Sequence, residues 1–386
     1  MCNSRFVGCC HAALPFDFEL VRPCLVTQTV GARNARWRRC ACICRQIGRD
    51  RNSPAKKACP KGIRMGLTAI RLWLMTLLAA VTLLPAGGQC EDVLKLAVGA
   101  PNNWDSGVPD IGQRAGIFSK HGLRLEMLYT SGGGETLQAV ISGSVDLGIG
   151  AGTGGVLGAF AKGAPVRILL AGTTGASDLF WYVPAASPLK SFAELGGKSV
   201  AYSTNGASTH ITLLALIKQF NIAAKPIATG ASAVTLTQAM SGQVDVGWAS
   251  PPFGLEALDE GRIRLIARGS DATSTHDQTV RVHIVNANVL AQRREVIDRF
   301  VAAYRESYEW LYDNPGGVKV YADYGKISER LAVRIRDEFL PKAALAPDRV
   351  LGIDATVRDA LDFKFIQAPP SREQLAELIR IPSPAR

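Results

Sequence analysis

From Asp92 onward, short runs of apolar residues alternate with longer stretches in which apolar and polar residues recur at helical spacing. The short runs predict buried strands, and the longer stretches predict helices. Strands that alternate with helices form a parallel sheet with helices on both faces, so the predicted fold class is α/β. The predicted strands are residues 93–100, 123–130, 145–152, 166–174, 197–204, 226–231, 244–250 and 263–270. The helices between them are residues 131–143, 154–163, 205–220 and 235–242.

One short motif occurs twice in this pattern. The segment SGSVDLG at Ser142–Gly148 returns about a hundred positions later as SGQVDVG at Ser241–Gly247. Each copy joins the end of a helix, a Gly that suits a left-handed cap, and a strand that starts with Val-Asp. The repeat therefore predicts two lobes built on one plan. We expect Asp146 and Asp245 to be structural and to accept hydrogen bonds from backbone N–H groups of the preceding turn.

The loops that follow the predicted strands define a candidate ligand site. In open parallel sheets, ligands bind outside the carboxyl ends of the strands, where loops lead into helix N-termini. These loops are rich in Gly, Ser, Thr and Asn, and two Trp residues are suited to covering the apolar part of a ligand. Arg268, at the end of the last strand, is a further candidate cation. The predicted ligand-binding residues are Asn103, Trp104, Ser131, Gly132, Gly133, Gly150, Ala151, Gly152, Thr153, Thr173, Thr174, Ser203, Thr204, Asn205, Ala207, Ser208, Thr209, Trp248 and Ser250.

Charge and cysteine separate the first 64 residues from the rest. Residues 1–64 hold 13 Lys and Arg against 3 Asp and Glu, whereas residues 65–386 hold 31 against 30. Because the net charge of +11 is concentrated in this extension, the near-neutral body does not suggest a nucleic-acid partner. Eight of the nine cysteines also lie there, and the cluster at Cys40–Cys44 lacks the second ligand pair that a zinc site needs. We expect residues 1–64 to be a non-native or disordered extension.

Residues 65–90 have the pattern of a secretory signal peptide. Arg71 precedes an apolar run at Leu72–Leu84, which is too short to span a bilayer, and small residues follow it. Gln89 stands where a lipid anchor at Cys90 would need a small residue. The mature protein is therefore expected to begin near Glu91, to be exported to the periplasm without a lipid anchor, and to hold together without disulfides.

Several sequence segments after residue 91, taken in order, resemble those of the solute-binding proteins of ABC importers. The resemblance is to the nitrate/sulfonate/taurine branch, also called the NMT1/THI5-like or SsuA-like family. It covers roughly residue 93 to the C-terminus. The segments are AGIFSKHGLRLEM (Ala115–Met127), GGGETLQAVISGSVDLGIG (Gly132–Gly150), AKGAPVRIL (Ala161–Leu169), SPLKSFAELGGKSVAYSTNGAS (Ser187–Ser208) and MSGQVDVGWASPP (Met240–Pro252).

The resemblance implies a type II periplasmic-binding-protein fold, in which a hinge joins two lobes around a ligand cleft. The first lobe would comprise residues 91–182, and the second residues 183–281. Residues 282–386 would return to the first lobe and end in helices. The resemblance places the two hinge crossings near residues 181–185 and 280–284.

The resemblance also implies a function. The chain would bind a small organic molecule and deliver it to a membrane permease and, through it, to an ATPase subunit. It would act as a monomer without catalysis, metal or cofactor. A sensor subunit that presents ligand to a membrane partner is one alternative. Another is an enzyme similar to pyrimidine-precursor synthases, although the cysteine-rich motif of that branch is absent from the body.

Two features bear on the ligand. Loops that end at helix N-termini favour an anionic group such as a sulfonate or carboxylate. The principal loops carry no Lys or Arg, and the Trp residues favour an organic portion over nitrate. The sequence GAGTGG at Gly150–Gly155 fits a dinucleotide fingerprint, but the acidic residue that should follow it is missing.

Overall fold

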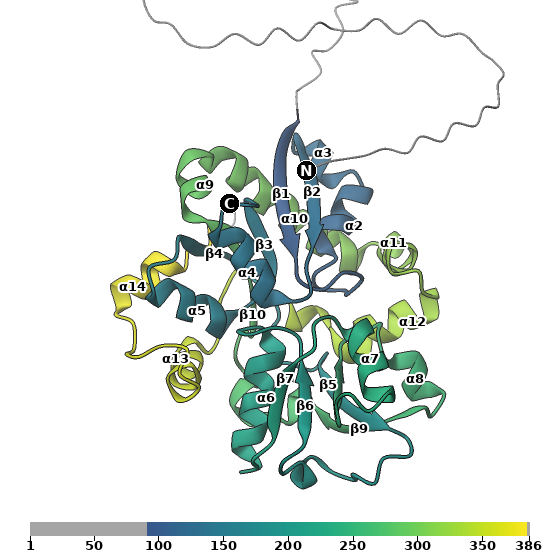
Figure 1. Cartoon of the computed structure of the whole chain (residues 1–386). Coiled ribbons are helices and arrows are strands. Elements are labelled where there is room, and N and C mark those ends of the chain that lie inside the picture. Colours follow the sequence, from purple (N-terminus) through teal and green to yellow (C-terminus); the bar gives the residue numbers. More distant parts are fainter. Residues whose placement is uncertain (1–90, 384–386) are drawn as a thin grey trace, which may run out of the picture. The chain divides into compact units, whose positions relative to one another are not determined.

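Two groups of β-strands organise residues 91–383, which are the residues that the computed structural model describes (Figure 1). The predicted extension and signal peptide lie outside these residues. The strands are β1 (Asp92–Val98), β2 (Leu123–Tyr129), β3 (Leu147–Gly152), β4 (Val166–Ala171), β5 (Phe180–Pro184), β6 (Ser199–Tyr202), β7 (Lys225–Ala228), β8 (Gly247–Ala249), β9 (Ile263–Arg268) and β10 (Arg281–Asn286).

The first lobe contains a five-stranded sheet in the order β2-β1-β3-β10-β4. Strand β1 is parallel to both of its neighbours, whereas β10 is antiparallel to β3 and β4. The inner parallel strands β1 and β3 are largely buried, which explains their nearly continuous apolar sequences.

The second lobe repeats this order. Strands β8-β5-β9 form one antiparallel sheet, and β6-β7 form a parallel pair. A parallel bridge between Val200 and Val246 connects the two, so the strands follow the order β7-β6-β8-β5-β9. In the strand order, β5 of the second lobe therefore occupies the same position as β10 of the first lobe. The predicted α/β class with two sheet-based lobes is confirmed, with one antiparallel insertion in each lobe.

In each lobe, one strand is antiparallel to both of its neighbours: β10 in the first lobe and β5 in the second. Each is the first strand that the chain forms after it crosses from the other lobe. The chain leaves the first sheet after Ala171 and enters the second at Phe180. It leaves the second sheet after Arg268 and re-enters the first at Arg281. The crossings therefore lie at residues 172–179 and 269–280. The first lies upstream of the expected residues 181–185, and the second ends at residue 280, where the expected range of 280–284 begins. Strands β5 and β10 are themselves buried strands of the two cores, so the chain completes each crossing before these strands begin.

The repeated motif joins neighbouring strands in both lobes. Asp146 Oδ2 accepts a hydrogen bond from the backbone N–H of Lys95 on β1, at 2.8 Å. Asp245 Oδ2 accepts from the N–H of Ser199 on β6, at 2.8 Å, and from the Ser199 hydroxyl at 2.7 Å. The donors thus belong to the adjacent strand and not to the preceding turn, which corrects that expectation. The Gly of each motif has the left-handed φ that a helix cap requires, +74° and +76°.

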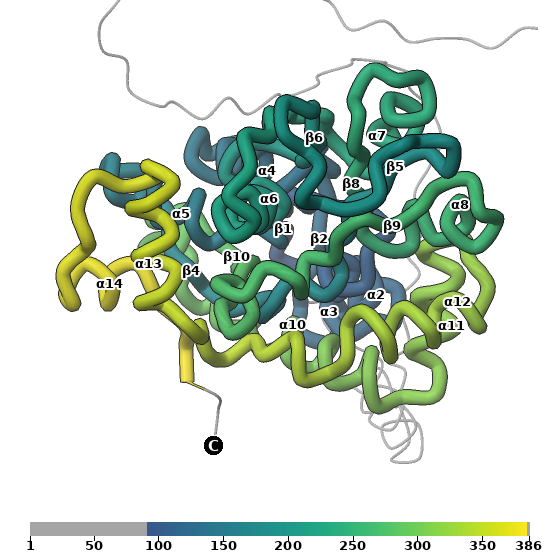
Figure 2. The backbone as a smooth tube through the Cα atoms, turned by 90° about the horizontal axis from the view of Figure 1, so that it is seen from below, coloured from purple at the N-terminus to yellow at the C-terminus, as the bar shows by residue number. Residues whose placement is uncertain are grey.

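Helices cover both groups of strands. They are α2 (Val108–Arg114), α3 (Ile117–Lys120), α4 (Gly133–Ile141), α5 (Thr153–Ala161), α6 (Ser208–Gln219), α7 (Ser232–Met240), α8 (Leu255–Asp259), α9 (Ala287–Gln292), α10 (Arg294–Asp313), α11 (Pro315–Gly325), α12 (Glu329–Arg334), α13 (Ile353–Asp362) and α14 (Arg372–Leu378). Figure 2 shows α13 and α14 beside α5, away from α11 and α12. Across residues 91–383, every helix is too short or too polar to cross a membrane.

The long helix α10 packs on the first lobe, as its apolar stripe predicts. Phe300, Tyr304 and Leu311 are buried, while Val296 lies half-buried at the edge of the stripe. Helix α10 contacts α2 and α3, which extends the core of the first lobe beyond its sheet. The C-terminal part of the chain therefore returns to the lobe in which it began.

Candidate functional site

A cavity of about 420 Å³, including its mouth, lies between the two lobes. Its walls come from the loop after β1, the start of α4, Gly150 of β3, the loops around β6 and α6, and the end of β8. Leu179 of the first crossing segment and Arg281, the first residue of β10, complete them. Ten of the predicted ligand-binding residues line it: Asn103, Gly132, Gly133, Gly150, Ser203, Ala207, Ser208, Thr209, Trp248 and Ser250.

Two helix N-termini from opposite lobes reach this cavity. Helix α4 begins after Gly132, and α6 begins after Ala207. Both helices lack a capping side chain at their own N-cap residue, and the first residues of both line the cavity. In the described part of the chain, the N–H of Gly134 in α4 donates to Thr204 of the facing lobe, which leaves the N–H of Gly133 free for a ligand. Because the first N–H groups of a helix have no partner within it, each end offers hydrogen-bond donors and a partial positive charge. Together the two ends form a suitable environment for an anionic group.

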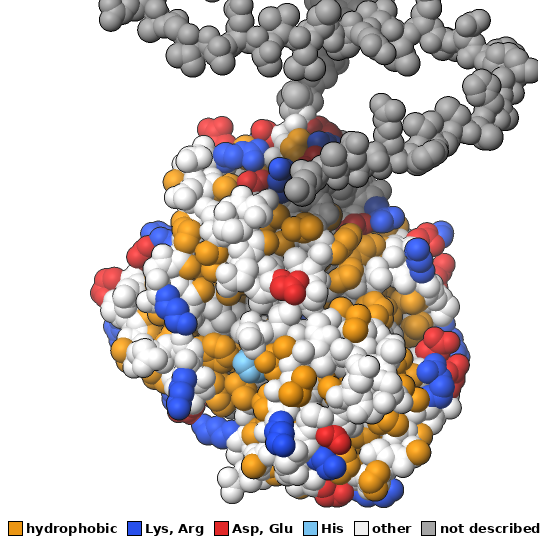
Figure 3. Space-filling model, viewed as in Figure 1, with side chains coloured by type: hydrophobic (Ala, Val, Ile, Leu, Met, Phe, Trp, Pro, Cys, Tyr) orange, Lys and Arg blue, Asp and Glu red, His pale blue; other side chains and the backbone are white. Residues whose placement is uncertain are grey.

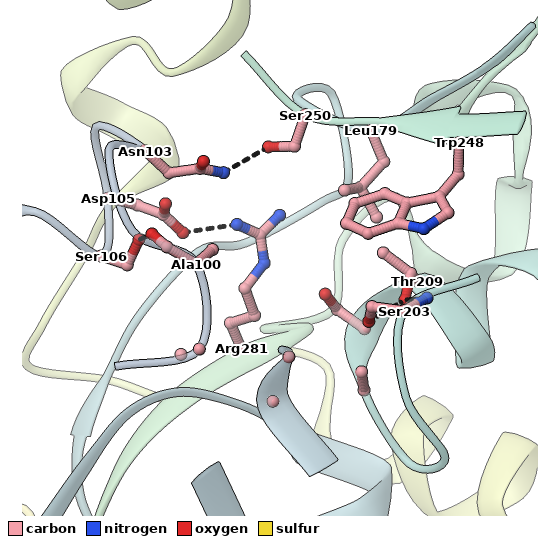
Figure 4. Close-up of a pocket in the computed structure, with 16 residues that line it drawn as sticks. Ala100, Asn103, Asp105, Ser106, Leu179, Ser203, Thr209, Trp248, Ser250 and Arg281 are labelled. Carbon is pink, nitrogen blue, oxygen red and sulfur yellow. Dashed lines mark hydrogen bonds and ion pairs between the residues drawn. The ribbon is translucent and has the colours of Figure 1, made fainter. Parts of the chain in front are cut away.

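A buried ionic network forms another part of the wall (Figure 4). Arg281, the first residue of β10, donates through Nη1 to Asp105 Oδ2 at 2.5 Å and through Nη2 to Asp178. All three side chains are at most 8% exposed. Asp178 lies in the first crossing segment, and Arg281 directly follows the second. Their ion pair therefore ties the two hinge crossings together.

Hydroxyl and amide groups extend the network to both lobes. Ser250 Oγ, at the end of β8, donates to Asp178 Oδ2 at 2.9 Å and accepts from Asn103 Nδ2 at 2.6 Å. Thr173 Oγ1 donates to Asp105 Oδ2 at 2.9 Å. Since Asn103 belongs to the first lobe and Ser250 to the second, the Asn103–Ser250 bond joins the lobes directly.

The two carboxyl groups respond differently to this environment. Burial raises the pKa of Asp178, and the neighbouring Asp105 charge adds to the rise, against the opposing effect of Arg281. Burial alone would raise the pKa of Asp105 as well. There, however, the Arg281 charge and the Thr173 hydroxyl outweigh it, so the pKa of Asp105 is lowered. Of the two carboxyl groups, Asp105 is the one whose pKa is held below its usual value.

The lobes also touch at a glycine-rich contact beside the cavity. The N–H of Gly134 donates to Thr204 Oγ1 at 2.9 Å. A Cβ atom at Gly134 would lie 2.2 Å from the carbonyl oxygen of Asn205, and one at Gly152 would lie 2.2 Å from that of Gly206. Only glycine at these positions lets the two backbones approach so closely. In this structure the lobes are closed over the cavity.

The two predicted tryptophans differ in position. Trp248 lines the cavity and is 5% exposed, and its indole N–H has no hydrogen-bond partner among residues 91–383. Figure 4 shows its ring on the opposite side of Arg281 from Asp105. Trp104 is fully buried between the rings of Tyr312 and Tyr321, in the core of the first lobe. Trp104 therefore does not cover the cavity, which corrects that part of the prediction.

The other predicted residues lie near the cavity but do not line it. Some support its walls: Thr173 holds Asp105, and Thr204 forms the contact between the lobes. Thr153 lines a second, smaller cavity at the rear. The remaining residues are engaged in the backbone or the surrounding structure; they are Ser131, Ala151, Gly152, Thr174 and Asn205. Arg268, the candidate cation, is exposed at the end of β9 and does not line the cavity.

Sequence reasoning missed the charged members of the site. Asp105 directly follows the predicted loop Asn103–Trp104, and Arg281 interrupts an apolar stretch that was interpreted only as a crossing. A lone Arg within an apolar strand could have been recognised, because a buried charge needs a partner. The partners themselves lie 176 and 103 residues away in the chain, so sequence spacing gave no indication of them.

The fold and the enclosed cavity define the class of the protein: two similar lobes, joined by two crossings, that close over one internal site. The model of the family described as NMT1/THI5 like matches residues 111–317, more than half of the chain. The protein therefore belongs to the NMT1/THI5-like family. No curated protein sequence matches the chain.

Solved structures share the fold at low sequence identity. The alkanesulfonate-binding protein SsuA from Xanthomonas axonopodis pv. citri, bound to MOPS, has a TM-score of 0.62 and 19% identity, covering 76% of this chain and 99% of that chain. The periplasmic aliphatic sulphonate-binding protein SsuA from Escherichia coli has a TM-score of 0.58 and 18% identity, covering 76% and 94%. The desulfurization enzyme DszB has a TM-score of 0.53 and 18% identity, covering 75% and 97%. These similarities confirm the expected type II periplasmic-binding-protein fold.

Proposed function

We propose that this protein is an exported solute receptor that binds a small organic anion in the cavity between its lobes and delivers it to the permease of an ABC importer. The observation that carries the proposal is the convergence of two helix N-termini, from α4 and α6, on one cavity between the lobes, where neither N-cap residue provides a capping side chain. A sulfonate or carboxylate group meets hydrogen-bond donors there from both lobes. Binding such a group would therefore stabilise the closed arrangement.

The energies required are modest. Each hydrogen bond to a charged group contributes about 1.5–3 kcal/mol. A micromolar receptor needs about 8 kcal/mol in total. A few bonds from the helix ends, together with contact on the Trp248 ring, suffice once the cost of ordering and closure is met.

The proposed mechanism is hinge closure without any chemical step. The crossings at residues 172–179 and 269–280 would act as the hinge, and the Asp178–Arg281 ion pair would keep them aligned. The Asn103–Ser250 and Gly134–Thr204 hydrogen bonds exist only when the lobes meet. Ligand in the cavity and these contacts at its rim would then favour the same closed state.

Export and the membrane partner are also proposals. They rest on residues 65–90 as a signal peptide, and they place the mature protein in the periplasm as a monomer. Mass spectrometry of the exported protein should find its N-terminus between Gly87 and Asp92. A secreted product that retains Cys2 would contradict this processing.

Exposed apolar side chains support a docking role for both lobes. They lie on β2 in the first lobe and on the equivalent edge strand β7 and helix α7 in the second; the residues are Leu128, Tyr129, Ile227, Val234 and Met240. The space-filling view in Figure 3 shows hydrophobic side chains over both lobes, with many charged ones towards the margins. A permease that contacts both lobes could distinguish their closed from their open arrangement.

The similarity to DszB favours a second candidate, an enzyme on the same fold. One DszB structure is of a variant in which a cysteine was replaced by serine, bound to a sulfinic acid. Residues 91–386 of this chain contain no cysteine, so a mature protein that begins at Glu91 has no thiolate nucleophile. This composition favours binding over DszB-like chemistry. A ligand-presenting sensor subunit would use the same cavity and differ only in its membrane partner.

A thermal-shift screen tests the proposed function. The mature protein, from residue 91, should be screened with sulfonates, carboxylates, amines and pyrimidines, and hits should be titrated by calorimetry. We expect organic anions to raise Tm, to bind with one-to-one stoichiometry and to be recovered unchanged. Stabilisation only by amines without an anionic group, or conversion of a bound compound into product, would contradict the proposal.

A further inference from the structure

The imidazole of His210 lies where the loop after β6 joins helix α6. His210 directly follows Ser208 and Thr209, which line the cavity, but does not line it itself. Its Nδ1 atom accepts a hydrogen bond from the backbone N–H of Gly206, at 3.2 Å. An imidazole nitrogen that accepts a hydrogen bond carries no proton, so this bond requires the neutral ring with its proton on Nε2.

The ring also packs between two aromatic side chains. It stacks on Tyr202, with ring centroids 4.2 Å apart and planes inclined by 11°. Tyr202 in turn donates its hydroxyl hydrogen to Asn205 Oδ1, at 2.6 Å. Phe365, which follows α13 in the first lobe, meets the imidazole edge-on, with centroids 5.7 Å apart. His210 therefore supports the loop of its own lobe and contacts the other lobe as well.

The two loop residues that this ring supports are those that meet the first lobe. The carbonyl oxygen of Asn205 faces Gly134 at the start of α4, where a Cβ atom would lie 2.2 Å from it. The carbonyl oxygen of Gly206 faces Gly152 and Gly155, where Cβ atoms would lie 2.2 and 2.4 Å from it. Backbones this close tolerate little displacement, so the conformation of the loop decides whether the lobes can meet.

We infer that His210 is a positioning residue for the cavity, because its neutral imidazole holds the loop at residues 203–207 in the conformation that lets the second lobe close on α4 and α5. This inference rests on the proposed function and adds a dependence on pH to it. The imidazolium ion has no acceptor atom, so protonation of His210 breaks the bond from Gly206. Closure is then disfavoured, and ligand affinity falls.

The groups around the ring determine how it titrates. The loop after β6 has no titratable side chain, and burial raises the pKa of Tyr202, which stays neutral in acid. Beside Phe365, Lys364 is exposed, and further along α6 the ammonium of Lys218 is paired with Asp362. Burial lowers the pKa of His210 to about 4, and no charged side chain of the described residues contributes to this shift.

The sign of the pH effect follows from this burial. When the lobes open, Phe365 leaves the ring and water reaches it, so the pKa of His210 returns towards its ordinary value of 6.5. The open state then binds more protons than the closed state between about pH 6.5 and pH 4, and affinity decreases as the pH falls through this range. A full return to 6.5 would make the affinity at pH 5 about twentyfold lower than at pH 7.

Two substitutions separate the acceptor from the ring. His210→Asn keeps an acceptor oxygen near the position of Nδ1 and does not titrate, whereas His210→Phe keeps an aromatic ring without an acceptor. The probe is butane-1-sulfonate, or the tightest-binding sulfonate of the screen if another binds better, because a sulfonate stays ionised throughout this pH range. Calorimetric titration of the mature protein at pH 7 and pH 5 gives the affinities.

The expected results differ between the two variants. Wild type should lose at least about threefold more affinity than His210→Asn between pH 7 and pH 5. The cavity carboxyl groups titrate in both proteins, so this difference reports His210 alone. At pH 7, His210→Phe should bind about threefold or more weakly than wild type, and His210→Asn should restore most of the affinity. The matched control is His121→Asn, which changes an imidazole bonded to Glu306 away from the cavity and should behave as wild type.

Equal pH dependence in wild type and His210→Asn, or wild-type affinity in His210→Phe, would overturn the inference. Deuterium exchange at residues 203–207 without ligand adds a measurement that needs no binding. Exchange should be faster in His210→Phe than in wild type and in His210→Asn. If no sulfonate binds, unchanged exchange in His210→Phe overturns the positioning role and faster exchange supports it. If no organic anion binds at all, the proposed function is wrong, whichever way the exchange result falls.

Discussion

The close approach of the two lobes at Gly134 yields a sharp prediction. Substitution with Ala adds a Cβ atom 2.2 Å from the carbonyl oxygen of Asn205 and 2.9 Å from Thr204 Oγ1. Because ordinary contact begins at 3.4 Å, the facing loop must retreat by roughly 1 Å. This movement breaks the Gly134–Thr204 hydrogen bond across the lobes.

The magnitude follows from these two effects. Overpacking of this kind costs about 1–3 kcal/mol, and loss of the hydrogen bond costs about 0.5–1.5 kcal/mol. The penalty applies only to the closed state, so a total of about 2–4 kcal/mol lowers ligand affinity by roughly thirtyfold to a thousandfold. The fold of each lobe should not suffer, since Gly134 lies in α4, where Ala is the better helix former.

Calorimetric titration of Gly134→Ala with the tightest compound from the screen measures the effect, and thermal unfolding without ligand measures the fold. The matched control is Gly196→Ala, because a Cβ atom there meets open space. We expect weakened binding in Gly134→Ala, wild-type affinity in Gly196→Ala, and little change of Tm in either. Wild-type affinity in Gly134→Ala would refute the view that these lobes close on each other around the ligand.

Three further predictions concern single side chains. Trp248→Ala should weaken binding at least tenfold, about 1.4 kcal/mol, while the protein stays folded, and calorimetry that finds unaltered affinity would place the site elsewhere. Asp245→Asn should lower the free energy of unfolding by about 1 kcal/mol through its bonds to Ser199 and leave affinity unchanged; loss of binding at unchanged stability would contradict a structural role. Burial lowers the pKa of His283 to about 4. The unfolded chain therefore binds more protons as pH falls from about 6.5 to 4, and this residue alone should destabilise the protein by about 2 kcal/mol between pH 7 and pH 5. Urea denaturation of wild type and His283→Gln at both pH values checks this, and an equally steep loss in the variant would refute it.

The strands that carry the parallel sheets could be predicted from sequence because their apolar runs are local signals. The loop Ser131–Gly134 and the start of α6 at Ser208 were found by the same reasoning, since they follow strands whose ends share an edge. Strands β5 and β10 were mistaken for hinges. Both strands are buried, but their pairing is set by strands up to about 140 residues away. A pattern within the sequence does not reveal which neighbour an inserted strand will take.

The charged part of the site escaped prediction for a related reason. Arg281, Asp178 and Asp105 meet only because two crossings and one loop converge behind the cavity. Asp105 and Asp178 taken alone are unremarkable in sequence, and Arg281, although it stands among apolar residues, gives no indication of its partners. Trp104 illustrates the opposite error, since it stands in a binding loop but turns into the aromatic core around Tyr312 and Tyr321. The predicted loops do lie at the cavity, but the sequence did not show which of their side chains point into it.

The central claim is that one small molecule closes the two lobes over the cavity. The most direct test is the distance between spin labels on Gln138 of α4 and Val234 of α7, both exposed and on different lobes. The mature protein has no cysteine of its own from residue 91 onward, so Gln138→Cys and Val234→Cys can be labelled selectively. We expect a broad distribution of distances between the two labels when no ligand is present. A saturating anionic ligand should shorten these distances and narrow their distribution. An unchanged distribution under saturating ligand would contradict the central claim.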